Sequence, residues 1–301
     1  MKPSEIKNSK ILLSPLNWGL GHVSRCIGLI NELLLNENDI VIACSNAERE
    51  IFETYFDVLT FELHDGYPFN FNGKGNFALD LLLSFQNLRQ RLKQELLEVS
   101  EMVEKYAPDY ILSDHRYSFR SNKVESVFIT HQLNLPVKWY QKSIQKWHIK
   151  LVKEFDDVWV MDYPDSRLAG DLSLSSKFVN SQYIGPYSRF MLKSELSDNN
   201  ESIILIASGP NVYAQQLISE QYQQGMRIIC ASDLLIPQGA KKIEGSWMDF
   251  DKEIRNCDLV ITRSGYSSIM DSEFLDCTFQ FSPTAGQSEQ EYLFRLHDRK
   301  K

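Results

Sequence analysis

The sequence lacks several features that mark large classes of protein. No two of its cysteines have CxxC spacing, and the total of five cysteines is odd. Scattered cysteines of this kind predict reduced thiols and argue against a disulfide framework or a zinc site. No uncharged apolar run reaches the roughly 18 residues of a membrane span. The polar first residues, MKPSEIKNSK, lack the apolar core of a signal peptide, so we expect a cytoplasmic protein.

Positive charge is also scarce. The chain has 32 Lys and Arg against 40 Asp and Glu, which gives a net charge of −8. A surface of this sign repels phosphate backbones, so nucleic acid is excluded as a general partner. Short-period repeats and low-complexity tracts are absent as well. What the chain does have is 301 residues, 43% of them hydrophobic, which is enough for two domains with a core each.

Short apolar runs alternate with helical patterns through both halves of the chain. In the first half, strand-like runs lie at 11–13, 39–45, 58–63, 109–116, 126–132 and 157–163. A polar connector follows near residue 190, and an apolar run at 203–208 starts the same alternation again. This pattern predicts an α/β protein with two Rossmann-like domains, residues 1–190 and residues 191–301.

A glycine-rich turn follows the first apolar run. Gly19 and Gly21 permit a tight backbone turn that leaves room for a ligand, and His22 follows at the start of a helical pattern. The turn differs from the dinucleotide-binding fingerprint GxGxxG, because Ser24 stands where that pattern requires its third glycine. The turn therefore indicates the first unit of a Rossmann-like sheet, but not a dinucleotide site.

His22 is the candidate catalytic residue. Near the positive end of a helix, an imidazole is biased toward its neutral form and can accept a proton from a hydroxyl group. The alternative is a histidine that only caps the turn. Asp114, Arg116, His131 and Gln132 end two neighbouring strand-like runs, where they can bind an acceptor or orient the histidine. A purely structural role for these four residues is an equally good interpretation.

The second half contains a stronger pattern, TRSGYSSIMDSE, over residues 262–273. Four polar side chains fall on one face of a predicted helix start: Ser264, Ser267, Ser268 and Asp271. We expect this face to be open to solvent, because hydroxyl groups and free backbone amides there can hold a diphosphate. The carboxylate can accept hydrogen bonds from a ribose. Ordinary helix capping explains the same residues equally well.

Another polar helix start follows the next strand-like run, in PTAGQSEQEYL over residues 283–293. Gln287, Glu289 and Gln290 lie there, and their side chains are suited to gripping sugar hydroxyl groups. An exposed helix start without a functional role is at least as good an interpretation of this spacing.

Both halves of the chain resemble one known family. TRSGYSSIMD, followed by a strand and PTAGQSEQ, is similar to the donor site of GT-B glycosyltransferases of the family 28 type, which include the peptidoglycan N-acetylglucosaminyltransferase. WGLGH is similar to the glycine-rich loop of that family, and the two motifs lie about 240 residues apart in the expected order. The resemblance implies a GT-B fold, in which two Rossmann-like domains face a cleft.

The same resemblance implies an activity. A sugar, in this family an N-acetylhexosamine, would move from a UDP-sugar on the second domain to a glycan or lipid-linked acceptor of the cell envelope on the first domain. The transfer would be inverting, and it would need neither a metal nor a cofactor.

The resemblance also assigns residues. On the first domain, Gly19, Gly21 and His22 would lie beside the acceptor. On the second domain, the implied donor site comprises Ser208, Gly209, Met248, Arg263, Ser264, Gly265, Ser267, Ser268, Asp271, Gln287 and Gln290.

Two departures from the family stand out. Asp276 replaces a glycine that usually follows the donor helix. Family members also end with helices that return to the first domain, whereas this chain stops after the helix that starts at Gln287. The second departure implies a truncated or weakly active protein.

A basic segment spans residues 137–153. Its apolar stripe comprises Val137, Tyr140, Ile144, Trp147 and Leu151, and its charged face comprises Lys138, Lys142, Lys146, Lys150 and Lys153. On an acidic protein, such a helix predicts peripheral contact with an anionic membrane surface, here the inner face of the membrane. A core-packed helix with a solvated lysine face is the alternative.

Two other functions fit the same motifs. GLGHVSRC also resembles the turn of the UDP-sugar hydrolase of pseudaminic acid synthesis, in which water replaces the acceptor. The third hypothesis is a non-catalytic partner that binds a nucleotide sugar and supports an active subunit.

Overall fold

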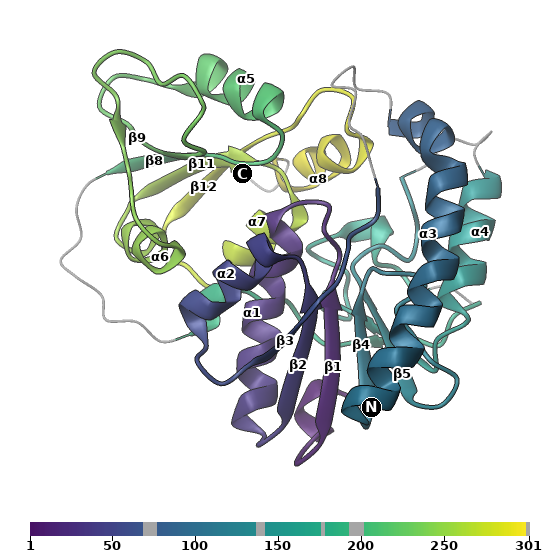
Figure 1. The fold of residues 1–301 in the computed structure, drawn as a ribbon. Coiled ribbons are helices and arrows are strands. Elements are labelled where there is room, and N and C mark those ends of the chain that lie inside the picture. Colours follow the sequence, from purple (N-terminus) through teal and green to yellow (C-terminus); the bar gives the residue numbers. More distant parts are fainter. Residues whose placement is uncertain (69–76, 137–141, 176–177, 193–201, 299–301) are drawn as a thin grey trace.

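The computed structural model describes residues 1–68, 77–136, 142–175, 178–192 and 202–298, and these form two parallel β-sheets flanked by helices (Figure 1). The larger sheet has the strand order β3-β2-β1-β4-β5-β6-β7, and the smaller sheet has the order β10-β9-β8-β11-β12. Every strand pair in both sheets is parallel. The predicted pair of Rossmann-like domains is therefore confirmed.

The first domain contains the larger sheet. Its strands are β1 (Lys10–Pro15), β2 (Asp39–Cys44), β3 (Thr60–Leu63), β4 (Tyr110–Asp114), β5 (Glu125–Thr130), β6 (Asp157–Val160) and β7 (Gln182–Tyr183). Its α-helices are α1 (Leu20–Leu35), α2 (Asn46–Tyr55), α3 (Phe77–Tyr106) and α4 (Lys142–Val152). Short 3₁₀ helices lie at Pro3–Glu5, Gly170–Leu172 and Arg189–Met191.

The second domain contains the smaller sheet. Its strands are β8 (Ile203–Ala207), β9 (Arg227–Cys230), β10 (Lys241–Lys242), β11 (Leu259–Arg263) and β12 (Thr278–Ser282). Its helices are α5 (Asn211–Gln221), α6 (Trp247–Arg255), α7 (Tyr266–Asp271) and α8 (Ser288–Asp298). The division expected near residue 190 falls between the two sheets, because β7 ends at Tyr183 and β8 begins at Ile203.

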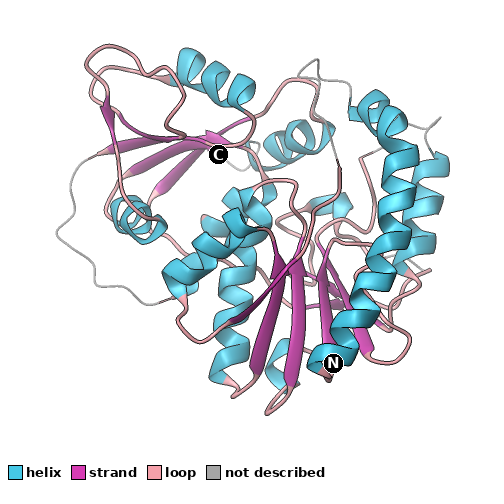
Figure 2. Cartoon of the chain, viewed as in Figure 1, coloured by secondary structure: helices cyan, strands magenta, loops and turns pink. Residues whose placement is uncertain are grey.

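Helices cover both faces of the larger sheet, which explains its continuous apolar strands (Figure 2). Within β1, Leu12 packs against Val99 and Val103 of α3. Its neighbours Ile11 and Leu13 point to the other face, where they join the core that contains α1. Alternate residues of one strand thus serve two different layers.

Helix α1 also holds the two domains together. Its residues share one buried core with Ile269 and Met270 of α7 and with Leu293 of α8. Gly28 lets the connector between the domains pass close to α1, since a Cβ atom there would lie 2.5 Å from the backbone oxygen of Ser188. The junction between the domains is therefore a continuous apolar core beside α1.

Helix α8 contacts the first domain. The Tyr292 hydroxyl accepts a hydrogen bond from the Asp171 backbone N–H at 2.7 Å, and His297 donates to the Leu168 carbonyl at 2.8 Å. The sequence ends soon after this helix, as the comparison with the family noted, so α8 itself provides the contact with the first domain.

No helix among the described residues is both long enough and apolar enough to cross a membrane.

Replacing Gly28 with Ala tests the close approach of α1 to the connector. We expect Gly28→Ala to lower the free energy of unfolding by about 1–3 kcal/mol, because the methyl group meets backbone atoms that cannot move aside. The measurement is chemical denaturation. Gly21→Ala is the matched control, since its Cβ would meet the Ser267 hydroxyl at 2.6 Å, which can rotate away, and Ser267 Cβ at the less severe distance of 3.1 Å. An equal loss in both variants would contradict the proposed cause.

Candidate active site

The candidate site lies where the carboxyl edge of the larger sheet meets helices of the second domain. The ring of His131, which follows β5, stacks on Tyr266 of α7 with ring centroids 4.1 Å apart. Its Nε2 atom lies 2.9 Å from Glu289 Oε1 of α8. Parallel strands place their carboxyl ends at one edge, which is where ligands bind in open α/β sheets.

His22 lies in the first turn of α1, next to the end of β4. Gly19 caps this helix at φ +113°, a conformation that favours glycine. His22 Nδ1 lies 2.8 Å from Asp114 Oδ2. The Asp114 side chain is fully buried, whereas 15% of the His22 side chain remains exposed. The structure thus brings together the predicted base and a carboxylate that can orient it.

Arg25 completes this pair, and the sequence analysis missed it. Its Nε donates to Asp114 Oδ2 at 3.1 Å, and its Nη2 donates to Oδ1 of the same carboxylate. Its Nη1 lies 3.0 Å from His131 Nδ1. The spacing of three residues from His22 is a signal that could have identified Arg25, because residues three apart share a helix face.

Burial and the charge of Arg25 keep His22 neutral. Burial alone would raise the pKa of Asp114, but Arg25 and His22 outweigh it and hold that pKa well below its usual range. Burial lowers the pKa of His22, Arg25 lowers it further, and Asp114 offsets only part of this effect. The predicted neutral imidazole therefore has burial and Arg25 as its causes, where the sequence suggested the helix end.

Three further histidines surround His22. The ring of His115 lies 6.2 Å from that of His22, 6.4 Å from that of His131 and 6.2 Å from that of His148. Burial, together with the neighbouring histidines, lowers the pKa of His115 far below its usual value. Burial lowers the pKa of His148 to about 4. The rings of His115 and His148 are therefore neutral at neutral pH.

The other first-domain candidates differ in their surroundings. Gln132 is buried and hydrogen bonds Glu289, so it lies at the junction of the domains. Arg116 is fully buried and pairs with Glu95 at 2.7 Å, and it also donates to the Asp65 carbonyl at 2.6 Å. The Arg116 guanidinium therefore makes its hydrogen bonds to other residues of the first domain. Gly21 packs against Ser267, so the glycine-rich turn touches α7 directly.

Two predicted donor-site residues are covered. Ser264 is fully buried and donates to the Gln290 carbonyl at 2.9 Å. Asp271 is buried, accepts from Arg189 Nη1 at 3.0 Å and also accepts from the Ser188 hydroxyl. The expected open polar face is therefore wrong at these two positions, because α8 contacts Ser264 and the connector contacts Asp271. Their roles toward a ligand stay predictions.

Two more predicted donor residues brace the loops at the edge of the smaller sheet. Arg263 donates to the carbonyls of Pro283 and Tyr213, each at 2.9 Å. Gln290 Oε1 accepts from the Thr284 backbone N–H at 2.9 Å. Both side chains therefore hold the segment between β12 and α8 in place.

The remaining donor-site candidates keep access to solvent. Ser208 and Gly209 are exposed after β8, and Met248 is 46% exposed at the start of α6. Gly209 has φ +92°, so the turn after β8 favours glycine. Four others are half-buried: Gly265, Ser267, Ser268 and Gln287. These residues are the ones that a nucleotide sugar could still reach.

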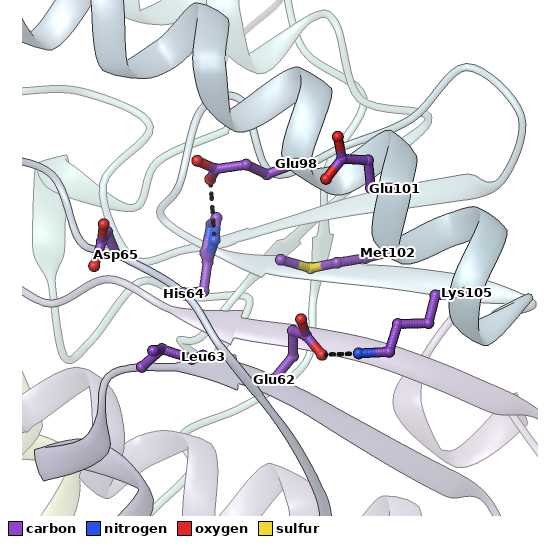
Figure 3. A pocket seen from close by; sticks show the side chains of 8 residues that line it. All are labelled: Glu62, Leu63, His64, Asp65, Glu98, Glu101, Met102 and Lys105. Atoms are coloured by element: carbon purple, nitrogen blue, oxygen red, sulfur yellow. Dashed lines mark hydrogen bonds and ion pairs between the residues drawn. The ribbon is translucent and has the colours of Figure 1, made fainter.

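A separate pocket of about 330 Å³ lies between β3 and α3 (Figure 3). His64 Nδ1 pairs with Glu98 at 3.2 Å and Lys105 pairs with Glu62 at 2.7 Å on its walls. Asp65 and Glu101 also line it, so carboxylates outnumber cationic side chains on its walls. Within the described residues, no group of three or more His, Cys, Asp or Glu side chains could hold a metal ion.

Comparison with known proteins decides the fold. The glycotransferase of kitacinnamycin is 14% identical with a TM-score of 0.61, and the alignment covers 97% of this chain and 85% of that one. Spinosyn rhamnosyltransferase SpnG, complexed with thymidine diphosphate, is 16% identical with a TM-score of 0.62 over 96% of this chain and 84% of that one. Arabidopsis thaliana UGT89C1, complexed with UDP-L-rhamnose, is 15% identical with a TM-score of 0.62 over 98% and 84%. The chain has the GT-B fold.

The sequence comparison covers less of this GT-B chain than the structural comparisons do. An uncharacterized glycosyltransferase of Methanosarcina acetivorans is 28% identical over 170 residues, which cover 52% of the GT-B chain. The match spans only 42% of that protein's length. No protein-family model matches the chain. The resemblance to family 28 therefore stays a prediction, whereas the GT-B fold itself is confirmed.

The buried histidines of this GT-B domain predict acid lability. A histidine whose pKa is lowered on folding binds fewer protons than it does in the unfolded chain, so stability is lost as the pH falls below the unfolded value of about 6.5. For His148 the loss continues to its folded pKa of about 4. Each such group contributes up to about 1.4 kcal/mol per pH unit in its window.

We expect His148→Gln to reduce this slope, because glutamine does not titrate yet can still pair with the Tyr117 hydroxyl, which lies 2.9 Å from His148 Nδ1. Urea denaturation between pH 8 and pH 5 measures how the free energy of unfolding depends on pH in the two proteins. Stability at pH 8 reports the packing cost of the substitution alone. Parallel curves for the two proteins would show that His148 does not carry the effect.

Proposed function

We propose that this GT-B chain is a glycosyltransferase that moves a sugar from a UDP-sugar to a glycan or lipid-linked acceptor. The observation that carries the proposal is the neutral His22 held by buried Asp114 where the two domains meet. The structural neighbours add support, since one was solved with UDP-L-rhamnose and another with thymidine diphosphate. The choice of UDP and of an N-acetylhexosamine rests on the resemblance to family 28.

The proposed reaction is an inverting displacement. The acceptor hydroxyl gives its proton to His22 Nε2 while its oxygen attacks the anomeric carbon of the sugar. A bond forms between that oxygen and the anomeric carbon, and the bond from this carbon to the diphosphate oxygen breaks on the opposite side. UDP leaves with the electron pair. Asp114 accepts a hydrogen bond from Nδ1 and stabilises the imidazolium that forms.

The proposed donor site uses the accessible polar groups of the second domain. Ser267 and Ser268 would contact the diphosphate, since both are half-buried at the start of α7. The Met248 backbone would contact the uracil ring of the donor, and Gln287 and Gln290 would face the sugar. Neutral hydroxyl groups of this kind would donate hydrogen bonds to the departing diphosphate. The proposed reaction uses neither a metal nor a cofactor.

A groove of about 340 Å³ between α3 and α4 supports a lipid-linked acceptor. Its walls are apolar at Leu88, Leu92 and Trp147, and they are basic at Arg89 and Lys93. An apolar groove with a basic rim suits a lipid chain with an anionic head group. Residues 137–141 of the basic segment lie outside the described residues.

In the described part of the basic segment, residues 142–153, the lysine side chains of α4 are exposed to solvent. Lys142, Lys146 and Lys150 are exposed on α4, whereas Trp147 packs its ring 5.7 Å from that of Tyr117. We infer that any contact with a membrane is peripheral and electrostatic, through these lysines at the inner face.

Loss of the base tests the proposed function. We expect His22→Ala to lower sugar transfer by 10²–10⁴-fold, because general base catalysis contributes about that much. Calorimetry should show donor affinity within about threefold of the wild type. The assay follows UDP release from a panel of UDP-sugars, with and without crude lipid or glycan acceptors.

Two outcomes, one from this assay and one that also follows the assembly of the protein, would favour a different function. Release of free sugar at equal rates with and without an acceptor would identify a UDP-sugar hydrolase. Unchanged activity in His22→Ala, with loss of a protein complex, would identify a non-catalytic partner subunit. Absence of any UDP or UDP-sugar binding by a folded preparation would contradict all three functions.

Charge reversal on α4 tests the membrane contact. We expect Lys142→Glu/Lys146→Glu to weaken binding to anionic vesicles by at least about 30-fold, because each lysine near the surface contributes about 1 kcal/mol. Co-sedimentation measures the binding. Lys241→Glu/Lys252→Glu is the matched control, since it makes the same charge change at exposed sites of the second domain. Equal binding by both variants would exclude α4 as the contact.

A further inference from the structure

Arg25 is a buried cation between the two domains, and its hydrogen bonds have only one possible direction. Its side chain is 3% exposed. A guanidinium donates and never accepts, so its contacts with Asp114 and with His131 Nδ1 are donations by Arg25. Because His131 Nδ1 accepts, the hydrogen of that ring is on Nε2. His131 therefore donates from Nε2 to Glu289 Oε1, which lies 2.9 Å away.

Two neighbours of His22 Nδ1 ask for opposite tautomers: Asp114 needs a donor there, and Arg25 needs an acceptor. Arg25 binds both oxygens of Asp114, which locks the carboxylate in one orientation with Oδ2 toward His22. An ionised carboxylate only accepts, so His22 Nδ1 donates to Oδ2 across their 2.8 Å distance. The lone pair of His22 is then on Nε2, which is the atom that a base at this position needs.

Arg25 Nη2 also lies 2.8 Å from His22 Nδ1. This donor competes for the nitrogen and favours the opposite tautomer. The ionised carboxylate is the stronger partner for Nδ1, and Nη2 already donates to Asp114 Oδ1, so we assign the Nδ1–H form. With Nη2 directed to Asp114 Oδ1, its charge instead opposes a second proton on the imidazole. One guanidinium thus influences both the orientation and the protonation of His22.

The chain of donors and acceptors continues into the second domain. It runs from His22 to Asp114 on β4, through Arg25 on α1 to His131, and ends at Glu289 on α8. Glu289 adjoins Gln290, the residue proposed to face the sugar. Contact between α8 and the first domain therefore reaches the candidate base through three intermediate side chains.

We propose that Arg25 is a positioning residue that selects the proton-accepting tautomer of His22 and connects this base to the donor domain through His131 and Glu289. The proposal rests on the proposed function for its catalytic meaning. The tautomer itself can be measured without any substrate.

The titratable and charged groups around the pair come from several elements. They are Asp114 from β4, Cys26 from α1, His115 and His131 from the strand ends, Tyr266 from α7 and Glu289 from α8. Arg25 lowers the pKa of His22, so its removal should raise that pKa. Activity requires neutral His22, and it is lost as the pH falls through this pKa. The acid limb of the pH profile should therefore move to higher pH in a variant without the guanidinium.

Histidine tautomers report directly on the proposal. The chain has six histidines, so selective ¹⁵N labelling gives few signals, and His22→Ala identifies the signal of His22. In the wild type we expect the Nδ1–H form of His22 and the Nε2–H form of His131. Arg25→Met should give His22 a mixture of tautomers. Arg25→Lys, which keeps the charge but cannot bind both carboxylate oxygens, guards against loss of folding in Arg25→Met.

Steady-state kinetics provide the second readout. Arg25→Lys should lower kcat at least 10-fold, with donor KM within twofold of the wild type, because the base is misplaced while the donor site is intact. The matched control is Arg227→Lys, whose guanidinium lies in the second domain and donates to Ser202 Oγ at 3.0 Å. We expect the control to keep the wild-type kcat.

Three results would overturn the role of Arg25. The first is an Nε2–H tautomer of His22 in the wild type. The second is an unchanged His22 tautomer in both Arg25 variants, and the third is an unchanged kcat in Arg25→Lys together with an unchanged pH profile in Arg25→Met. If the wild type transferred no sugar but its tautomers responded as expected, the proposed function would fail while the positioning role would stand.

Discussion

The structure around the candidate site depends on one buried ion pair, between Arg25 and Asp114. A carboxylate without solvent needs a cation and hydrogen bonds, and removing either partner of such a pair leaves a costly buried charge. Both residues occupy their positions because α1 packs on the strand that ends at Asp114. The orientation of His22, its neutral state and the contact to His131 all follow from this arrangement.

Arg25 also explains why two domains can meet around polar residues. Each carboxylate at the junction has a partner: Asp114 pairs with Arg25, Asp251 and Asp271 both pair with Arg189, and Glu289 accepts a hydrogen bond from His131. Apolar residues of α1, α7 and α8 fill the space beside them. The junction therefore excludes water from its interior, while part of the His22 ring stays accessible.

The sequence predicted features that depend on local pattern. Alternating apolar runs and helical periods indicated two parallel sheets, and the residues at strand ends placed Asp114 near His22. Contacts across the domains were not predictable in this way. The stacking of Tyr266 on His131 and the covering of Asp271 by Ser188 join residues more than 80 positions apart. The helical spacing of residues 264–271 placed Asp271 on a polar face that we expected to be open to solvent. No sequence pattern in the connector indicated that Ser188 would cover it.

The packing of α1 against α7 and α8 bears on how proteins of this architecture can be recombined. Ile27 of the first half and Met270 and Leu293 of the second belong to the same core. A chimera that replaced residues 191–301 with the matching half of another protein would leave the apolar face of α1 without its partners. Exchange of the second domain would thus require the apolar face of α1 to be transplanted together with it.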